Sequence, residues 1–425
     1  MKKSVLLLGS GGREHAIARS LNQSPHLSSL FVMPGNPGTA SLGTNIPIAA
    51  DDVAAIVNWI RLNPVDLVIC GPEAPLAVGL MDEIRAAFPQ QKIGLIGPGK
   101  AGALLESSKS YAKSFMARHQ IPTAAYSAFQ SHQMNEVLQF IHSLLPPIVL
   151  KADGLAAGKG VIICPDHESA IREAGEMLSG KFGSASSTLV IEEFLHGIEF
   201  SVFALTDGKD FVLLPEAKDY KRIGEGDTGP NTGGMGAVSP VHFVNDELMS
   251  KVLSRIVVPT INGLQKENIP YCGIVFFGLI NVKGDPFVIE YNVRLGDPET
   301  EVILPRLETD LLTLFLAATE GTLSGTMAKI SEQFATTIVL ASQGYPAAFE
   351  KGKFVHLPSM LDRSQILFHS GTIQDDHGIK TAGGRVFAAT GLGVSQADAL
   401  LKANELAASV HFEGKYFRRD IGFDL

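Results

Sequence analysis

The segment from residue 287 to 299, FVIEYNVRLGDPE, constrains this chain more than any other stretch. Read as a β-strand, it places Glu290, Asn292 and Arg294 on one face, each about 7 Å from the next. The opposite face then carries three apolar side chains: Ile289, Tyr291 and Val293. Carboxylate and amide oxygens suit Mg²⁺, and a guanidinium suits a carboxylate or phosphoryl group. A solvated edge strand is the alternative, but this register favours a metal–phosphate site at Glu290 and Asn292.

Composition narrows the class of protein. A chain of 425 residues predicts about two to four domains. With 45% hydrophobic and 19% charged residues it reads as globular, and a net charge of -9 argues against a nucleic-acid partner. No apolar run approaches the length of a membrane span, and the amino terminus lacks a signal-peptide pattern. The three cysteines have no metal or disulfide spacing, so we expect reduced thiols and a cytoplasmic protein.

The amino-terminal part alternates between strands and helices. Four short apolar runs each end in a turn rich in glycine or proline: residues 5–8, 30–33, 67–70 and 93–96. Helical stretches such as 53–62 and 77–88 lie between them. This alternation predicts a doubly wound parallel sheet with its turns gathered at one edge, where ligands bind in open α/β folds.

Two of these turns carry candidate binding groups. The glycines of Gly9-Ser-Gly-Gly12 allow backbone N–H groups to approach a phosphate at a helix start. Tight packing of strand against helix explains them equally well, and Glu14 stands where a dinucleotide fingerprint needs a third glycine. Glu73 either holds sugar hydroxyls or caps the following helix.

The next part carries lysines around a glycine-rich loop. A helical stretch at 101–119 contains Glu106, Lys109 and Lys113. The loop 153–160 joins one strand to another, at 148–151 and 161–164, so it is not a Walker A loop. Lys151 and Lys159 flank it, which predicts a lid over polyphosphate rather than a plain hairpin. The apolar strand 189–193 with its following turn suits adenine, with Glu199 near the ribose.

Residues 224–237 contain so many glycines that we expect neither helix nor strand there. Lys218, Lys221 and Arg222 precede this loop and favour an anionic ligand; a flexible linker is the alternative. A helix is expected at 246–264, and a strand at 273–280 that is antiparallel to the segment at 287–294. Strands near 336–341, 366–370 and 385–390 and a helix at 395–410 predict a small β-rich closing domain. Its polar candidates read as packing or surface groups: Tyr345, Arg385, Arg418 and Arg419.

Five motifs together resemble the glycinamide ribonucleotide synthetases (phosphoribosylamine–glycine ligases) of the ATP-grasp superfamily. These are residues 9–16, 71–76, 151–160, 227–237 and 294–299, and the resemblance covers essentially the whole chain. It departs from the family at His196, Ile198 and Glu301, the last standing where glutamine is common.

The resemblance implies one step of de novo purine biosynthesis. ATP, as co-substrate with Mg²⁺ or Mn²⁺, phosphorylates the carboxylate of glycine. The amine of 5-phosphoribosylamine then attacks glycyl phosphate and gives glycinamide ribonucleotide, ADP and phosphate. A monomer is favoured, with a dimer as the alternative.

The resemblance also implies roles for individual residues. Glu290 and Asn292 hold the metal, and the catalytic group is Lys151, Asp219 and Arg294. The ATP contacts are Lys109, Lys151, Gly154, Gly158, Lys159, Gly160, Glu192, Glu193, Leu195 and Glu199. The contacts to the other substrates are Gly11, Gly12, Glu14, Asn36, Glu73, Asn231, Thr232, Gly233, Gly234 and Arg294.

We expect three domains: an α/β substrate-binding domain at 1–103, an ATP-grasp catalytic region at 104–330 and a β-rich domain at 331–425. A lid subdomain is expected at about 124–196. Three other functions fit some of these features. They are a related ATP-grasp carboxylase or ligase with another acceptor, a nucleotide-binding regulator without turnover, and a nicotinamide dehydrogenase.

Overall fold

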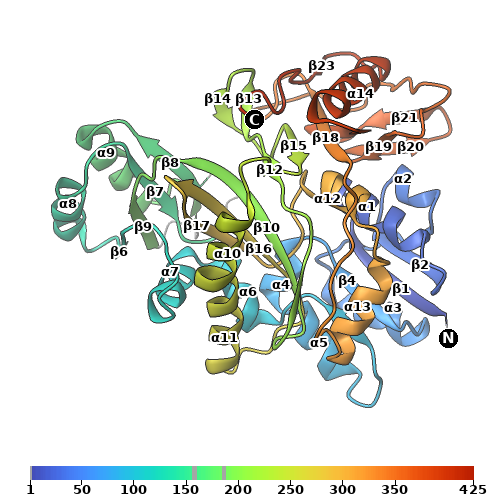
Figure 1. Cartoon of the computed structure of the whole chain (residues 1–425), viewed down its shortest axis with the longest axis horizontal. Helices are drawn as coiled ribbons and strands as arrows, with labels where there is room; N and C mark the ends of the chain where they lie inside the picture. The colour runs from blue at the N-terminus through green and yellow to red at the C-terminus, as the bar shows by residue number, and fades with distance from the viewer. Residues whose placement is uncertain (1, 156–159, 184–187) are drawn as a thin grey trace.

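The computed structural model describes residues 2–155, 160–183 and 188–425. Within these residues, four sheets of four or more strands and two separate hairpins build the molecule (Figure 1). The amino-terminal sheet lies beneath the carboxyl-terminal sheet in this view, and a third lobe with α8 and α9 projects to the left. The α/β multidomain architecture predicted from the sequence is confirmed.

The amino-terminal sheet is parallel throughout, with strand order β3-β2-β1-β4-β5. Its strands are β1 (Lys3–Gly9), β2 (Leu27–Pro34), β3 (Thr44–Asn45), β4 (Leu67–Cys70) and β5 (Gly94–Ile96). Leu6 and Leu8 of β1 pack into one hydrophobic core with α3 (Val53–Leu62), whereas Val5 and Leu7 pack into another with α1 (Gly12–Asn22). Helices therefore cover both faces, as the doubly wound sheet requires.

Two stretches expected as single helices are each interrupted. The first is divided into α4 (Glu73–Val78) and α5 (Leu80–Ala87) by Gly79, whose φ of +95° is left-handed. The second is divided into α6 (Lys100–Ser107) and α7 (Lys109–Arg118) by Ser108, whose hydroxyl accepts a hydrogen bond from the Tyr111 amide. The prediction of unbroken helices is wrong at these two residues.

The projecting lobe is an antiparallel sheet with strand order β6-β9-β7-β8. Its strands are β6 (Tyr126–Gln130), β7 (Ile148–Ala152), β8 (Val161–Cys164) and β9 (Thr188–Glu193). Two helices, α8 (Met134–Ser143) and α9 (His167–Leu178), share a hydrophobic core with it. The predicted antiparallel pairing of β7 with β8 is confirmed.

The central sheet is antiparallel and has the order β11-β10-β16-β17. Its strands are β10 (Ile198–Thr206), β11 (Phe211–Leu213), β16 (Gly273–Val282) and β17 (Asp285–Asn292). Helices α10 (Asp246–Val252) and α11 (Val258–Lys266) pack beside it and are joined by a π-helical turn at Leu253–Val257, where we expected one continuous α-helix. The predicted pairing of β16 with β17 is confirmed.

A β-bulge in β17 changes which side chains face the core. Glu290 pairs with Gly278, but the next pair is Val288 with Leu279, so Ile289 is the extra residue. Val288 is consequently 0% exposed beside Tyr291 and Val293, while Ile289 is only half-buried. The prediction that Ile289 shares the apolar face was wrong, because strict alternation fails at a bulge.

The carboxyl-terminal sheet has the order β12-β15-β18-β22-β19, with β23 also pairing with β18. Its strands are β12 (Lys218–Asp219), β15 (Gly236–Ser239), β18 (Phe334–Ser342), β19 (Gln365–His369), β22 (Arg385–Gly393) and β23 (Lys415–Tyr416). Helix α14 (Gln396–Ser409) packs against β18 and β22, and a hairpin of β20 (Thr372–Asp375) and β21 (Gly378–Thr381) lies nearby. Helices α12 (Thr300–Arg306) and α13 (Leu311–Glu320) precede this sheet in the chain.

The glycine-rich stretch is ordered as strands, so the prediction of an irregular loop was wrong. It forms a hairpin of β13 (Arg222–Gly224) and β14 (Thr228–Asn231), followed by β15. Gly226 and Gly229 have φ of +65° and +78°, conformations that the turn and bulge of the hairpin need. Gly236 lies against the Thr337 carbonyl, where a Cβ would come within 2.6 Å. The glycines therefore permit this tight hairpin.

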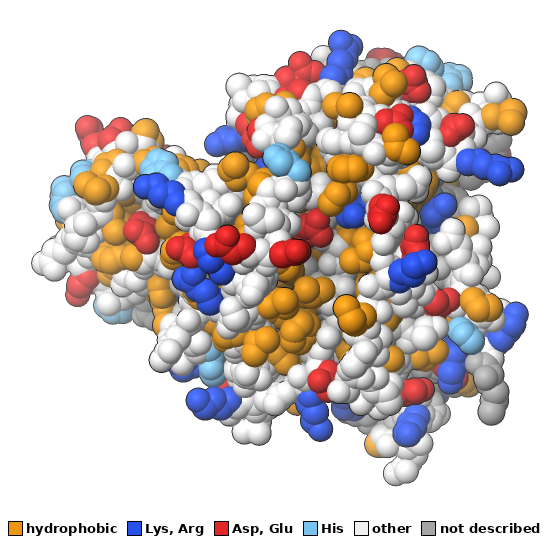
Figure 2. Space-filling view, in the orientation of Figure 1, with side chains coloured by type: hydrophobic (Ala, Val, Ile, Leu, Met, Phe, Trp, Pro, Cys, Tyr) orange, Lys and Arg blue, Asp and Glu red, His pale blue; other side chains and the backbone are white. Residues whose placement is uncertain are grey.

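The outer surface carries no single-sign field on the face shown in Figure 2, where acidic and basic side chains are interspersed. Within the described parts of the chain, no helix combines the length and apolar character needed to cross a membrane.

Candidate active site

The polar face of β17 meets the carboxyl edge of the amino-terminal sheet. Glu290 and Asn292 are partly exposed on it, while Tyr291 between them is buried. Among the described residues, none forms a hydrogen bond or ion pair with the Glu290 carboxylate. No group of three or more acidic, histidine or cysteine residues there is arranged to hold a metal. A free carboxylate beside an amide oxygen nevertheless fits Mg²⁺, which takes one or two protein ligands and completes its shell with phosphates and water.

Arg294 follows directly and is held on several sides. Its Nη2 lies 2.8 Å from Glu106 Oε1 and 3.0 Å from Asn292 Oδ1, and its Nε lies 3.5 Å from Glu73 Oε2. Burial raises the pKa of Glu106, whereas for Glu73 the nearby arginines outweigh burial and lower the pKa. The structure thus brings Glu73 and Arg294 together, and it adds Glu106, which was not among the predicted site residues.

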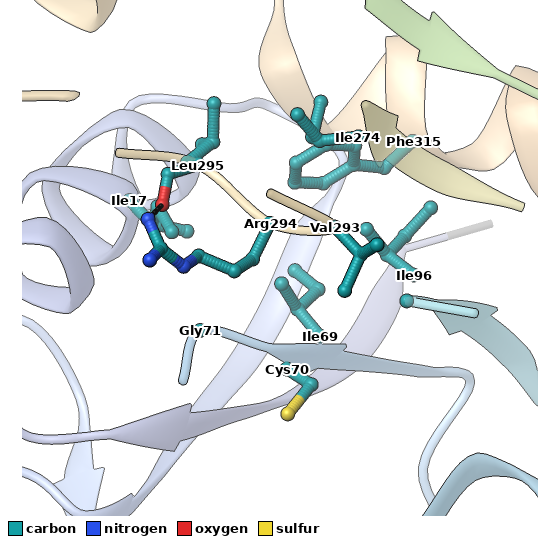
Figure 3. Close-up of a pocket in the computed structure, with 11 residues that line it drawn as sticks. Ile17, Ile69, Cys70, Gly71, Ile96, Ile274, Val293, Arg294, Leu295 and Phe315 are labelled. Atoms are coloured by element: carbon teal, nitrogen blue, oxygen red, sulfur yellow. Dashed lines mark hydrogen bonds between the residues drawn. The ribbon is translucent and has the colours of Figure 1, made fainter. Parts of the chain in front are cut away.

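A small cavity lies behind Arg294, at the ends of β4 and β5 (Figure 3). Its volume is about 10 Å³, room for a single water molecule, and apolar groups such as Ile69, Ile96 and Phe315 line it. Arg294 points along its rim and donates to the Leu295 carbonyl at 3.2 Å. This void belongs to the packing between sheet and strand and is too small for a substrate.

Two lysines meet one buried glutamate where the projecting lobe joins the central sheet. Lys151 Nζ is 2.9 Å from Glu192 Oε1, and Lys113 Nζ is 2.8 Å from Glu192 Oε2. Lys151 also donates to the Ile289 carbonyl at the bulge, at 3.3 Å. Burial lowers the pKa of Lys113 to about 8. The sequence showed Lys113 on the same helix as Lys109 but gave no sign that it shares a carboxylate with Lys151.

The entrance to the glycine loop lies at the start of α7. Asp153 Oδ1 accepts from the Ser110 amide at 2.6 Å, and Lys109 Nζ donates to the Gly154 carbonyl at 3.2 Å. Gly160 contributes its carbonyl to the Ala152 amide at 2.8 Å. The predicted ATP contacts Gly158 and Lys159 lie outside the described residues.

The other predicted adenosine contacts lie in strands β9 and β10 and in the turn between them. Glu193 Oε1 accepts from the Ala125 amide at 2.8 Å, and Leu195 is half-buried. Glu199 Oε2 lies 2.9 Å from Lys221 Nζ, and Asp219 lies 4.0 Å from the same ammonium group. Burial raises the pKa of Asp219.

The glycine turn after β1 encloses Glu14. The Glu14 carboxylate accepts from the Gly11 amide and from Arg13 Nε, both at 2.6 Å. A Cβ at Gly71 would come within 2.0 Å of this carboxylate, so glycine is required there. Asn36 is also fully engaged: its amide donates to the carbonyls of Ser10 and His369, each at 2.9 Å. Both side chains shape the turn from within.

The segment after β14 contacts the carboxyl-terminal part of the chain. Arg385 Nη1 donates to the Gly233 carbonyl at 2.5 Å and lies 3.1 Å from Asp297 Oδ1. The Gly233 amide donates to the Tyr345 hydroxyl at 2.9 Å, and the Thr232 hydroxyl donates to the Lys221 carbonyl at 2.8 Å. Arg385 and Tyr345, which we expected to be packing or surface groups, contact the glycine-rich segment itself. Of the other predicted substrate contacts there, Asn231 is exposed and Gly234 is buried.

Two buried acids follow strand β17. Burial raises the pKa of Glu299 to about 8. Glu301 is 0% exposed, and neither of its carboxylate oxygens has a hydrogen-bond partner in the described structure. A Cβ at Gly12 would come within 2.3 Å of Glu301 Oε1. This carboxyl therefore lies where the turn after β1 meets α12.

Comparisons with known proteins match three consecutive parts of this chain to three domains of one family. The descriptions are "Phosphoribosylglycinamide synthetase, N domain" over residues 3–106, its "ATP-grasp (A) domain" over 107–300 and its "C domain" over 335–424. A phosphoribosylamine–glycine ligase of Vibrio vulnificus is 44% identical over 425 residues, 99% of this chain and 98% of the relative. One of Agrobacterium fabrum is 42% identical over 420 residues, with the same shares covered.

Solved structures of known proteins have the same fold as this chain. The crystal structure of phosphoribosylamine–glycine ligase from Thermotoga maritima superposes with a TM-score of 0.86 at 37% identity, covering 98% of this chain and all of that one. The biotin carboxylase domain of a Hydrogenobacter thermophilus 2-oxoglutarate carboxylase, solved with MgADP and bicarbonate, reaches 0.73 at 14% identity. It covers 99% of this chain and 92% of its own, and shares the fold alone.

The fold and the matched ATP-grasp domain together define an ATP-dependent ligase of the ATP-grasp class. With all three domains matched, the chain belongs to the phosphoribosylglycinamide synthetase family.

Proposed function

We propose that this enzyme joins glycine to 5-phosphoribosylamine through glycyl phosphate, releasing ADP and phosphate, in de novo purine biosynthesis. The observation that carries the proposal is the polar face of β17. There the Glu290 carboxylate, which has no hydrogen bond or ion pair with any described residue, stands in line with the Asn292 amide and, just beyond the strand, the Arg294 guanidinium. Lys151 lies beside them at the bulge.

The residues of this face have separate tasks in the proposed reaction. Glu290 and Asn292 hold Mg²⁺, with Mn²⁺ as the alternative, and the bound ion neutralises charge on the ATP phosphates. Lys109 and Lys151 orient the phosphates from the lobe side. Phosphoryl transfer depends on positioning and charge neutralisation more than on a protein nucleophile, so this set of groups suits it.

Arg294 binds the carboxylate of glycine and then its phosphorylated form. Its fork already holds Glu106 and Asn292, so its orientation is fixed before substrate arrives. Glu73, Gly11 and Gly12 face the acceptor from the edge of the amino-terminal sheet. Glu192 and Glu14 act through protein groups, since their carboxylates already bind Lys151 and Lys113 or Arg13 and the Gly11 amide.

The remaining roles are assigned by domain. Residues 1–103 bind the acceptor, 104–330 carry ATP and the metal, with a lid subdomain at about 124–196, and 331–425 close the site. Leu195, Glu193 and Glu199 frame adenosine, and Asp219 acts beside Lys221. We further propose that the protein is a monomer in the cytoplasm, where its three free cysteines stay reduced.

The test is a coupled ADP-release assay with phosphoribosylamine generated in situ. ADP release is expected only when glycine and phosphoribosylamine are present together. Replacing both by bicarbonate should give background turnover. Rapid turnover with bicarbonate would assign the site to a carboxylase and overturn the proposal.

A further inference from the structure

The carboxyl-terminal segment 415–425 is bound to the glycine-rich hairpin through one buried arginine. The Arg418 side chain is 0% exposed. Its Nη1 lies 2.6 Å from Asp227 Oδ1, in the hairpin turn, and 3.1 Å from the Arg222 carbonyl. Its Nε and Nη2 each lie 2.9 Å from an oxygen of Asp420. One guanidinium therefore joins two carboxylates from distant parts of the chain.

Further hydrogen bonds join the segment 415–425 to the hairpin of β13 and β14. The Gly226 amide donates to Asp420 Oδ2 at 2.7 Å, and the Tyr416 hydroxyl donates to the Ile223 carbonyl at 2.8 Å. The Arg419 amide donates to Glu225 Oε1 at 3.1 Å. Figure 1 shows the carboxyl terminus beside β13 and β14. The hairpin is thus held at one strand and at its turn by the end of the chain.

The same end of the chain also holds the residues that begin the hairpin. The Arg418 guanidinium lies 5.5 Å from the ring centre of Tyr220, which is 1% exposed. The Tyr220 hydroxyl donates to Asp424 Oδ1 at 2.7 Å, and Lys218 Nζ lies 3.2 Å from Asp424 Oδ2. In extended backbone, side chains alternate, so Lys218 and Tyr220 face the terminal segment and their neighbours face the other way.

Those neighbours are Asp219 and Lys221, which lie against the central sheet at Glu199. Lys221 Nζ lies 2.9 Å from Glu199 Oε2. Glu199 lies two residues before Ser201 on β10, Ser201 pairs with Gly278, and Gly278 pairs with Glu290, so Glu199 and Glu290 lie on the same face of the central sheet. Burial acts to lower the pKa of Lys221, but the carboxylates of Asp219, Glu199 and Glu290 outweigh it and hold the pKa well above its ordinary value. The position of this short strand therefore decides how the ammonium of Lys221 stands relative to the Glu290 carboxylate.

We propose that Arg418 is a positioning residue for the ligase reaction: through Tyr220 and the hairpin β13–β14 it sets where Asp219 and Lys221 stand relative to Glu290. The inference rests on the proposed function for the role of Glu290. Only arginine suits this position, because its planar fork binds Asp227 and Asp420 in different directions at once, and a lysine ammonium on a flexible stem cannot fix both.

The test compares Arg418→Ala and Arg418→Lys with Arg419→Ala. Arg419 is the matched control, because it is the next residue, it is exposed, and among the described residues its guanidinium lies only against the Phe417 ring. All kinetics are run well below the melting temperature of each variant, so the protein stays folded. Arg418→Ala should raise the KM for MgATP about tenfold and Arg418→Lys by an intermediate factor, since small misplacements of charged groups weaken binding strongly. Arg419→Ala should stay within about twofold of the parent.

A second pair of measurements separates positioning from folding. Asp227→Asn keeps the size of the side chain and serves if Arg418→Ala fails to fold; it should raise the same KM. In a Lys221→Ala background, Arg418→Ala should add little, because the two act along one path. An unchanged KM in a folded Arg418→Ala or Asp227→Asn variant, or effects that multiply fully, would overturn the inference. Normal activity of Glu290→Gln would instead refute the proposed metal site and leave the KM comparison standing.

Discussion

Arg385 Nη1 lies 3.1 Å from Asp297 Oδ1 and 2.9 Å from the Asp297 carbonyl, so strand β22 of the carboxyl-terminal sheet contacts the turn that follows β17. The same nitrogen binds the Gly233 carbonyl. One guanidinium therefore holds together three segments that are far apart in sequence. Its placement makes the carboxyl-terminal sheet part of the site.

Replacing Arg385 by alanine should lower kcat/KM by about 10²-fold, because it frees both the turn at Asp297 and the segment at Gly233. Steady-state kinetics with glycine and phosphoribosylamine varied in turn measure the effect. Arg363→Ala is the control, since Arg363 is exposed and also lies in the carboxyl-terminal part of the chain. Equal activity of the two variants would show that the contact does not serve catalysis.

The bulge in β17 predicts an inverted order of stability for two neighbours. Val288→Ala removes methyl groups from a 0% exposed position and should lower the free energy of unfolding by about 2 kcal/mol. Ile289→Ala removes more atoms, yet it should lower that free energy by less than about 1 kcal/mol because its side chain is half-buried. Denaturant unfolding of both variants measures the difference. The reverse order would contradict the bulge.

The sequence predicted the parallel sheet because its signals are local: short apolar runs ending at glycine and proline. It also placed Glu290, Asn292 and Arg294 together, since these three lie on the carboxyl side of the bulge. It missed the face of Val288, because a bulge has no dependable residue signature. It missed Glu106, Lys113 and Arg385 for another reason. Their partners Arg294, Glu192 and Asp297 are distant in sequence, and only tertiary packing brings them together.

The glycine-rich segment shows the limit of composition. Glycine disfavours strands by its entropy alone, so irregular backbone was the expectation. In the fold, strand β18 pairs with β15, and Arg418 binds the hairpin turn at Asp227. These long-range bonds override the local preference, as tertiary context often does.

The buried carboxyl of Glu301 should make the protein less stable as the pH rises. Its buried carboxyl has no hydrogen-bond partner among the described residues. Its pKa is raised well above the ordinary value, by burial first and then by Asp297, with Glu299 acting the same way and Arg385 opposing. The folded state therefore keeps a proton that the unfolded state loses above about pH 4.5, so the penalty is absent below that pH and grows as the pH rises.

Glu301→Gln should remove this penalty and raise the free energy of unfolding by about 1–3 kcal/mol at pH 8, with no gain near pH 4. Melting temperatures of parent and variant across this range measure it. Glu320→Gln, at an exposed position on α13, should follow the parent at every pH. A gain that is the same at pH 4 and pH 8 would show that the carboxyl does not titrate as argued.

The proposed metal site at Glu290 and Asn292 predicts that activity requires a divalent ion and that a Glu290 variant requires more of it. Chelation with EDTA should abolish ADP release, and added Mg²⁺ should restore it. Glu290→Gln keeps the shape of the side chain but removes the charge of a carboxylate that makes no hydrogen bond or ion pair to any described residue. We expect the Mg²⁺ concentration for half-maximal activity to rise by about 10–100-fold, as for other weakened metal sites.

Glu247→Gln, on the exposed start of α10, is the control and should leave the Mg²⁺ titration unchanged. The fold should be unaffected in both variants, because neither carboxylate is buried. A Glu290→Gln enzyme with the parent's Mg²⁺ titration would mean that the ion is bound by other groups, and the order of charges along β17 would then need another explanation.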